Sequence, residues 1–235
     1  MAVNVVGRGM LARAFESNDL NDCLFFCSGV SKSSEKNIKE FEREKTLLIE
    51  NMDLHNDKCF VYFSSILSSS RSNEYYNHKF EIEQYISQNS KNYLIIRLPQ
   101  VAGKVLNNTL FPFLVKSIYS GSILKIFTTS KRAIVDVDDI YEGFNLIFKS
   151  GLRNRVIDFC PNYSFEPIEL AQLISSYLKK NLNVEYIDCE SIQECKPSII
   201  VKELNLFDTK DVYLNKIVSK YTPEIIELIL DYTKQ

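Results

Sequence analysis

The chain has 235 residues, a formal net charge of -2 at pH 7 and a sequence pI near 5.8. Its 28 basic residues are scattered, so we expect no nucleic-acid partner. No apolar run reaches the roughly 18 residues of a membrane span, and the N-terminus does not have the pattern of a signal peptide. We therefore expect a cytoplasmic protein that does not cross or enter a membrane.

Glycine and cysteine usage adds further limits. The chain has 7 glycines, where average usage of roughly 7% would give about 16, so glycine positions are informative. Two histidines make a histidine-based metal site improbable, and we expect no metal. The cysteines form no CxxC pair, and we expect reduced thiols, mostly in the core. They are Cys23, Cys27, Cys59, Cys160, Cys189 and Cys195.

Short apolar runs alternate with helix-patterned stretches along the chain. In chain order we expect a strand at 3–6, a helix at 9–16, a strand at 23–27, a helix at 33–51, a strand at 59–63, a helix at 74–87, a strand at 93–97, a helix at 110–119, strands at 123–127 and 133–137, a helix at 138–149, a strand at 156–159, a helix at 167–179, a strand at 184–187 and a helix at 223–234 with proline at its first position. This alternation predicts an α/β fold with a doubly wound parallel sheet.

The first strand leads into a G-x-G-x-x-A turn that opens the first helix. Gly7 permits the tight turn, Gly9 removes a Cβ where a diphosphate would approach the backbone, and Ala12 lets the helix pack on the strand. The first helical turn, at Met10 and Leu11, then offers N–H groups to the anion. The motif indicates a dinucleotide site; the alternative is a tight β–α turn without a ligand.

A tyrosine and a lysine lie at i and i+4 on a later helix, Tyr75 and Lys79. A nearby ammonium favours phenolate, so we expect a lowered pKa for Tyr75. Such a tyrosine can exchange a proton with a carbinol or carbonyl oxygen. Ser65, at the end of the preceding strand, could hydrogen-bond the same oxygen. His78 and Glu83 are expected on the solvated face of this helix.

In these motifs the chain resembles the short-chain dehydrogenase/reductase superfamily. It is most similar to the extended branch of NAD-dependent epimerases and dehydratases that modify nucleotide sugars, including proteins like dTDP-4-dehydrorhamnose reductase. The resemblance runs through most of the chain, in the order of the family's motifs. The segments that carry it are 60–65, which ends in the serine that would match the family's catalytic Ser/Thr, Tyr75-x-x-x-Lys79, 96–103, 132–139 and 164–174.

The resemblance implies a Rossmann-type core at 1–150 and a mainly substrate-binding lobe at 151–235, with 104–127 as a further candidate part of the lobe. It implies that Tyr75 is the general acid/base, that Lys79 holds the nicotinamide ribose and that Ser65 polarises the substrate oxygen. The implied contacts to the cofactor, NAD or NADP, are Gly7, Arg8, Gly9, Met10, Leu11, Ser28, Gly29, Val30, Lys79, Leu98 and Pro99. The implied contacts to a nucleotide-sugar substrate are Gln100, Asn107, Asn108 and Arg132. A homodimer is a further family expectation.

The chain departs from the family between the first helix and residue 23. The family usually has two more strands there, the first ending in an acid that binds the adenosine ribose. Asp19 and Asp22 lie in a different context from that acid, so the adenosine half of the site is shortened and NAD cannot be told from NADP. Arg8 could pair with a phosphate, including a 2′-phosphate; a solvated loop arginine is the alternative.

The residues after Ser65 narrow the reaction. The family's 4,6-dehydratases follow this serine with Asp-Glu, where this chain has Ile66 and Leu67. Epimerase–reductases use a cysteine there and a later histidine, and no histidine follows His78. The reactions that remain need only one hydride and one proton: ketone reduction, alcohol oxidation, or epimerisation through a transient ketone. We expect a keto-sugar reductase in surface polysaccharide or deoxysugar biosynthesis, with a nucleotide-sugar 4-epimerase or a non-enzymatic Rossmann binding module as alternatives.

Overall fold

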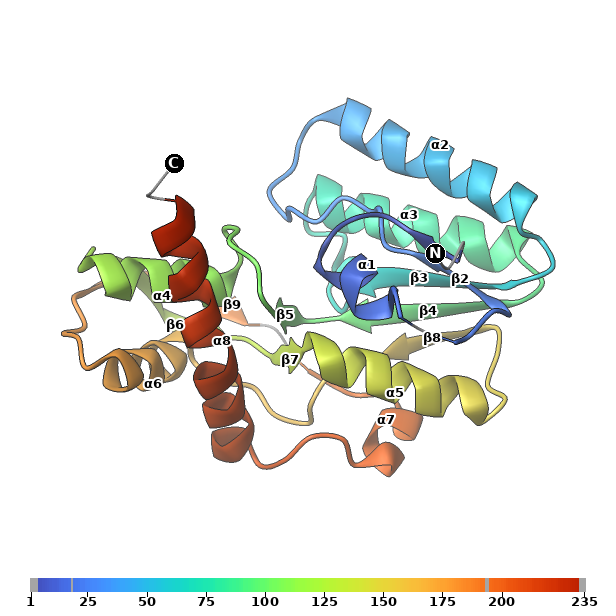
Figure 1. The fold of residues 1–235 in the computed structure, drawn as a ribbon. Helices are drawn as coiled ribbons and strands as arrows, with labels where there is room; N and C mark the ends of the chain where they lie inside the picture. Colours follow the sequence, from blue (N-terminus) through green and yellow to red (C-terminus); the bar gives the residue numbers. More distant parts are fainter. Residues whose placement is uncertain (1–3, 18, 193–194, 233–235) are drawn as a thin grey trace. The chain divides into compact units, whose positions relative to one another are not determined.

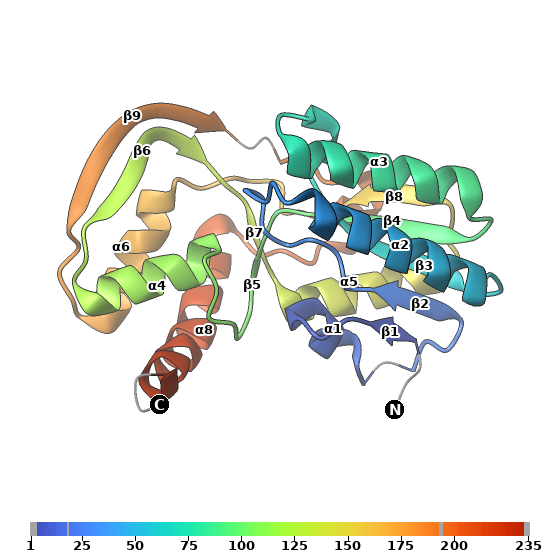
Figure 2. The same cartoon turned by 90° about the horizontal axis from the view of Figure 1, so that it is seen from above.

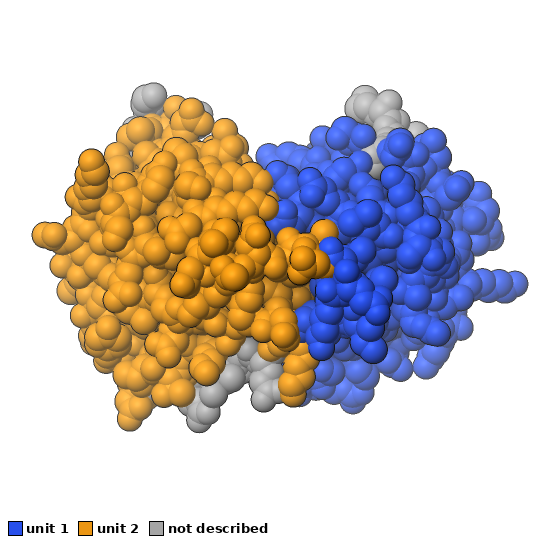
Figure 3. All heavy atoms as spheres, turned by 90° about the horizontal axis from the view of Figure 1, so that it is seen from below, with its two compact units in different colours: residues 1–99, 137–159, 197–204 blue, residues 100–136, 160–196, 205–235 orange. Residues whose placement is uncertain are grey.

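The computed structural model describes residues 4–17, 19–192 and 195–232, with 189–192 described as backbone only. Predictions that fall on residue 3, on the Cys189 side chain and on residue 234 lie outside the described part. The chain forms two compact units. Unit 1 contains residues 1–99, 137–159 and 197–204, and unit 2 contains residues 100–136, 160–196 and 205–235 (Figure 3).

Unit 1 is built on a five-stranded parallel sheet (Figure 1). Its strands, in spatial order, are β1 (Val5–Val6), β2 (Cys23–Phe26), β3 (Cys59–Ser65), β4 (Tyr93–Leu98) and β8 (Arg155–Asp158). Its helices are α1 (Met10–Phe15), α2 (Ile38–Leu54), α3 (Glu74–Asn89), α5 (Val137–Lys149) and α7 (Ile199–Leu204), with a 3-10 turn at Ser68–Ser70. The parallel strands and the alternating helices confirm the predicted fold class.

Both faces of this sheet are covered, because alternate strand residues point to opposite sides. On one face α2 and α3 pack on the sheet (Figure 2), in a cluster that contains Leu24, Leu48, Phe60 and Ile82. On the other face Phe15 of α1 packs against strand and α5 aromatics. Each fully buried large apolar side chain contributes about 1.5–3 kcal/mol, so these two layers hold the unit together.

The connection from β1 to β2 is unusual. It steps across the sheet in the same direction as the connections through α2 and α3, but α1 lies on the opposite face. Two strand–helix–strand connections have opposite hands when they step in the same direction along the sheet but place their helices on opposite faces. Nearly all connections between parallel strands are right-handed, so two opposite hands in one sheet are unusual. The family that the sequence resembles usually has two more strands between the first helix and this point of the chain, and their absence would explain the difference; here the chain goes from α1 directly to β2.

Unit 2 contains two small parallel sheets and three packed helices. The strand pairs are β5 (Gln100–Ala102) with β7 (Ile134–Asp136) and β6 (Leu124–Lys131) with β9 (Val184–Ile192). The helices are α4 (Leu110–Ser120), α6 (Pro167–Leu178) and α8 (Lys210–Tyr232). Asp136 is fully buried and accepts hydrogen bonds from Tyr221 and Lys220, which ties α8 to β7.

The sequence-based boundary near residue 150 falls inside unit 1, because α5 and β8 belong to that unit. The prediction that the last helix begins at Pro223 is wrong, since α8 begins at Lys210 and Pro223 lies inside it. An interior proline removes a helical hydrogen bond. Here Tyr221 and Ile225 on either side are buried, and their packing holds the helix together.

The cysteines that the structure describes are free thiols, and Cys23, Cys59 and Cys160 are buried as expected. Cys23 and Cys59 are direct neighbours across β2 and β3. Their hydrogen bond and burial raise the pKa of Cys23, and burial raises the pKa of Cys27. Within the described ranges, no helix is both long enough and apolar enough to cross a bilayer.

Candidate functional site

The glycine turn follows β1 at the carboxyl end of the sheet, and the structure distinguishes its two glycines. Gly7 has φ +130°, and a Cβ there would lie 2.7 Å from the Cys27 carbonyl oxygen. A Cβ on Gly9 would have no heavy atom within 4 Å. Glycine is therefore required at position 7, because a side chain there would clash with the backbone that follows β2. Gly9 leaves open space next to the first turn of α1. Arg8 is exposed beside them.

The segment Ser28–Val30 continues from β2 and lies against this turn. The same Cβ on Gly7 would be 3.1 Å from the Ser28 nitrogen. A Cβ on Gly29 would lie 2.6 Å from Lys79 Nζ, and the Val30 N–H donates to Glu44 at 2.7 Å. The backbone of this segment thus contacts the glycine turn on one side and the lysine of α3 on the other.

The tyrosine and lysine of the YxxxK motif lie near the start of α3. Asn73 caps this helix by accepting from the Tyr76 N–H. Tyr75 and Lys79 are both buried, and Lys79 Nζ lies 5.8 Å from the Tyr75 ring centroid. The predicted pair is therefore on one helix face, as its spacing indicated.

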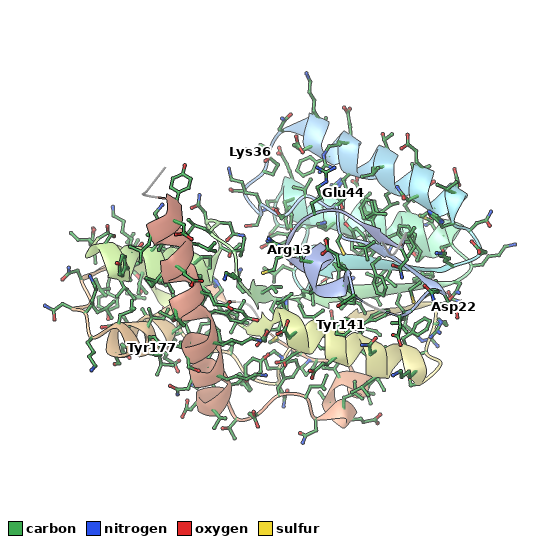
Figure 4. The ribbon with its side chains drawn as sticks, in the orientation of Figure 1. Arg13, Asp22, Lys36, Glu44, Tyr141 and Tyr177 are labelled. Atoms are coloured by element: carbon green, nitrogen blue, oxygen red, sulfur yellow. The ribbon has the colours of Figure 1, made fainter. Side chains whose placement is uncertain are left out.

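Lys79 is held by two residues that sequence reasoning missed, Glu44 and Tyr62. Its Nζ donates to Glu44 Oε1 at 3.0 Å and to the Tyr62 hydroxyl at 2.9 Å. The Tyr62 hydroxyl donates to Glu44 Oε1 at 2.6 Å. Glu44, labelled in Figure 4, projects from α2 and is fully buried. Lys79 and Glu44 therefore form a buried ion pair, and the Tyr62 hydroxyl is hydrogen-bonded to both of them.

The prediction that His78 is solvated is wrong. His78 is 8% exposed, and its Nε2 lies 3.2 Å from Glu44 Oε2 while its ring packs on Phe41. The sequence pattern could have indicated that Glu44 is buried, because Glu44, Leu48 and Met52 recur at four-residue intervals on one face of α2. A carboxylate on such an apolar stripe must find buried partners.

This cluster reverses the expected direction of the tyrosine shift. Burial opposes ionisation of Glu44, but Lys79, His78, Tyr62 and the Val30 N–H outweigh it and lower the pKa of Glu44. Burial, and then the negative charge of Glu44, raise the pKa of Tyr75. The structure thus favours the neutral phenol of Tyr75, because burial and the nearby carboxylate both disfavour the phenolate.

Glu44 makes the fold sensitive to acid. Because its pKa is lowered in the folded state, its stabilising contribution is present at neutral pH and is lost as pH falls below the ordinary carboxyl range of about 4 to 5. One such group changes stability by at most about 1.4 kcal/mol per pH unit. Urea unfolding at decreasing pH should show a shallower decline for E44Q/K79M than for the wild type. Parallel declines would contradict this assignment.

Ser65 ends β3 directly opposite Leu98 of β4. Its Oγ accepts from the Leu67 N–H at 3.2 Å, and the Ile66 N–H donates to the Leu98 carbonyl. Leu98 is buried and Pro99 follows it, partly exposed. These predicted residues therefore lie at the carboxyl end of the central strands, where ligands bind in sheets of this type.

A second buried cluster supports these strand ends, and it overturns the expectation that Glu83 is solvated. Glu83 is 1% exposed and accepts hydrogen bonds from Ser64 and Ser68. Arg97 of β4 donates to both of its carboxylate oxygens. The buried residues of α3 are Tyr75, His78, Lys79, Ile82, Glu83 and Ile86.

The predicted substrate contacts all lie in unit 2. Gln100 begins β5. Asn107 Oδ1 accepts from the Thr109 N–H and hydroxyl next to the start of α4, so its oxygen serves the local turn. Asn108 is exposed, and Arg132 pairs by backbone with Phe165. Their role toward a substrate stays a prediction.

No protein-family model matches the sequence, and no curated protein matches it. Solved structures are similar to it. UDP-glucose 4-epimerase from Bifidobacterium longum, in complex with NAD+ and UDP, is 15% identical with a TM-score of 0.67, over 88% of this chain and 77% of that one. RMD from Pseudomonas aeruginosa, complexed with NADPH, is 14% identical with a TM-score of 0.62, over 91% and 87%.

A third similar structure is dTDP-glucose 4,6-dehydratase from Bacillus anthracis str. Ames in complex with NAD, at 14% identity and a TM-score of 0.65, over 82% of this chain and 74% of that one. At these identities the similarity establishes the fold. The resemblance seen in the sequence is thereby confirmed at the level of the fold: the chain has the Rossmann-type α/β fold of these similar structures.

Proposed function

We propose that the chain is an NAD(P)-dependent enzyme that acts on a nucleotide-activated sugar, most specifically a keto-sugar reductase. One observation carries the proposal. A continuous row of close approaches within unit 1 joins the Gly7 turn to Ser28, Gly29 to Lys79, and Lys79 to Tyr75. The Ser28–Val30 segment therefore links the glycine turn to the Tyr75 and Lys79 pair, and a dinucleotide that reaches from one to the other would lie along this segment.

The residues present fit a nicotinamide dinucleotide. The open space at Gly9 suits a diphosphate next to the first turn of α1. Met10 and Leu11 supply N–H groups, the Ser28–Val30 segment would lie along the cofactor, and Lys79 would bind the nicotinamide ribose. Leu98 and Pro99 would line the nicotinamide. Arg8, exposed beside the turn, is available to a 2′-phosphate. NAD and NADP stay equal candidates.

The bound nicotinamide would supply the hydride, and the protein's own groups would manage the proton. Ser65 Oγ would hydrogen-bond the ketone oxygen. The Tyr75 hydroxyl would donate its proton to that oxygen as the hydride reaches the carbonyl carbon, giving an alcohol and a phenolate that bulk water reprotonates. A raised pKa keeps Tyr75 protonated at neutral pH, and this favours the reducing direction over alcohol oxidation.

Cofactor titration and substrate turnover test the proposal in sequence. NADH or NADPH should bind, measured by nicotinamide fluorescence, and a nucleoside-diphosphate 4-keto-hexose should then consume the reduced cofactor. Y75F should lower turnover by about 100-fold or more while the protein stays folded. Y85F makes the same change further along α3 and should leave turnover unchanged. Undiminished turnover in Y75F would overturn the mechanism, and redox-neutral turnover would select the 4-epimerase.

A binding module without catalysis is the second candidate. The Glu44 carboxylate already neutralises Lys79, and the turn from α1 to β2 omits the adenosine-side strands. Binding of neither cofactor at millimolar concentration would favour this module over the enzyme.

A further inference from the structure

We propose that Glu44 is a positioning residue for cofactor binding: it orients the ammonium of Lys79 so that one N–H stays available to a ligand hydroxyl. The inference rests on the proposed function. It concerns a residue of α2, outside the serine, tyrosine and lysine of the predicted site.

The contacts of Glu44 leave it no freedom to turn. Its Oε1 accepts from Lys79 and Tyr62, and its Oε2 accepts from the Val30 N–H and lies within hydrogen-bond distance of His78. The carboxylate is fully buried. One side chain therefore joins β3, α3 and the Ser28–Val30 segment, the parts that would surround a nicotinamide ribose.

The hydrogen bonds of Lys79 show how many of its N–H groups remain available to a ligand. An ammonium has three N–H groups. Glu44 Oε1 and the Tyr62 hydroxyl accept two of them. Gly29 lies beside this ion pair, where a Cβ would come within 2.6 Å of Nζ and 2.9 Å of Glu44 Oε1. Glycine there keeps side-chain atoms away from the ammonium, and the remaining N–H can meet a ligand.

Glu44 also supplies the negative charge that balances Lys79. The charged and titratable groups that face Lys79 are Glu44 from α2, Tyr62 from β3 and Tyr75 from its own helix, and His78 shares the same carboxylate. Glu44 is thus the anion that balances a 2% exposed ammonium. Without this anion, the ammonium of Lys79 would be a buried charge without its counterion.

A double-mutant cycle on NADH and NADPH binding tests the inference. K79M should weaken binding by about tenfold to a hundredfold, the range of one charged hydrogen bond. E44Q should weaken it by about tenfold, because the ammonium loses the carboxylate that orients it. E44Q/K79M should bind like K79M, because Glu44 acts through Lys79. E42Q, an exposed glutamate of the same helix, should bind like the wild type.

Circular dichroism confirms folding of each variant. If E44Q does not fold, Y62F replaces it in the same cycle. It removes one of the two acceptors of Lys79 and keeps the charges, so it should weaken binding several-fold in the wild type and not at all in K79M. Wild-type affinity in E44Q, or losses that multiply in the double variant, would overturn the inference alone. Failure of the wild type to bind either cofactor would overturn the proposed function, and this inference with it.

Discussion

Gly7→Ala is expected to destabilise unit 1 by about 3 kcal/mol or more. Two costs combine. A backbone at φ +130° is strained for any residue with a Cβ, at about 1–3 kcal/mol. The added Cβ would also lie 2.7 Å from the Cys27 carbonyl oxygen and 2.8 Å from its carbon, and these are backbone atoms directly after β2 that cannot rotate away as a side chain can. Urea unfolding followed by circular dichroism measures the loss.

Gly9→Ala is the matched control for this prediction. Gly9 has φ -77°, and its added Cβ would have no heavy atom within 4 Å. Stability should therefore change by less than about 0.5 kcal/mol. NADH affinity should nevertheless fall, because the methyl group would occupy the space proposed for the diphosphate. An equal stability loss in both variants would contradict the different roles given to the two glycines.

Local patterns predicted the strands and most helices of unit 1 because each is short, apolar and next to its neighbour in the chain. The runs at 23–27, 59–63 and 93–97 became β2, β3 and β4 with only small changes at their ends. The pairing of β5 with β7 and of β6 with β9 joins segments that are far apart in the sequence. No local pattern encodes such pairing, and so neither the full extent of unit 2 over residues 100–136 nor the place of residues 151–159 in unit 1 was predicted.

The site could be predicted as a set of motifs but not as an electrostatic unit. The i, i+4 spacing singled out Tyr75 and Lys79 as candidates, and Ser65 was a candidate because it ends a predicted strand. Glu44 lies 35 positions before Lys79, and its contact with Lys79 depends on how α2 and α3 pack on the same face of the sheet. Burial of Tyr75 and then the negative charge of Glu44 raise its pKa, a direction that the YxxxK spacing alone predicted with the wrong sign.

Arg97→Met is expected to cost about 3–5 kcal/mol of folding free energy. Arg97 donates to both oxygens of Glu83, with its Nη2 2.5 Å from Oε2, and Glu83 is 1% exposed. Methionine fills similar space but leaves the carboxylate with only the hydroxyls of Ser64 and Ser68. A buried charge without its counterion is strongly destabilising. Arg155→Met, at an exposed arginine on the neighbouring strand β8, should change stability by less than about 0.5 kcal/mol.

Removing the charge of Glu83 as well separates the ion pair from simple packing. In E83Q/R97M the glutamine oxygen can still accept from Ser64 and Ser68, and no uncompensated charge stays in the core. The double variant should therefore be more stable than R97M, by more than about 1 kcal/mol, because neighbouring partners in one network are not additive. Additive losses would show that the guanidinium contributes through its contacts with the surrounding chain, and not through the carboxylate that it now holds beneath the end of β3.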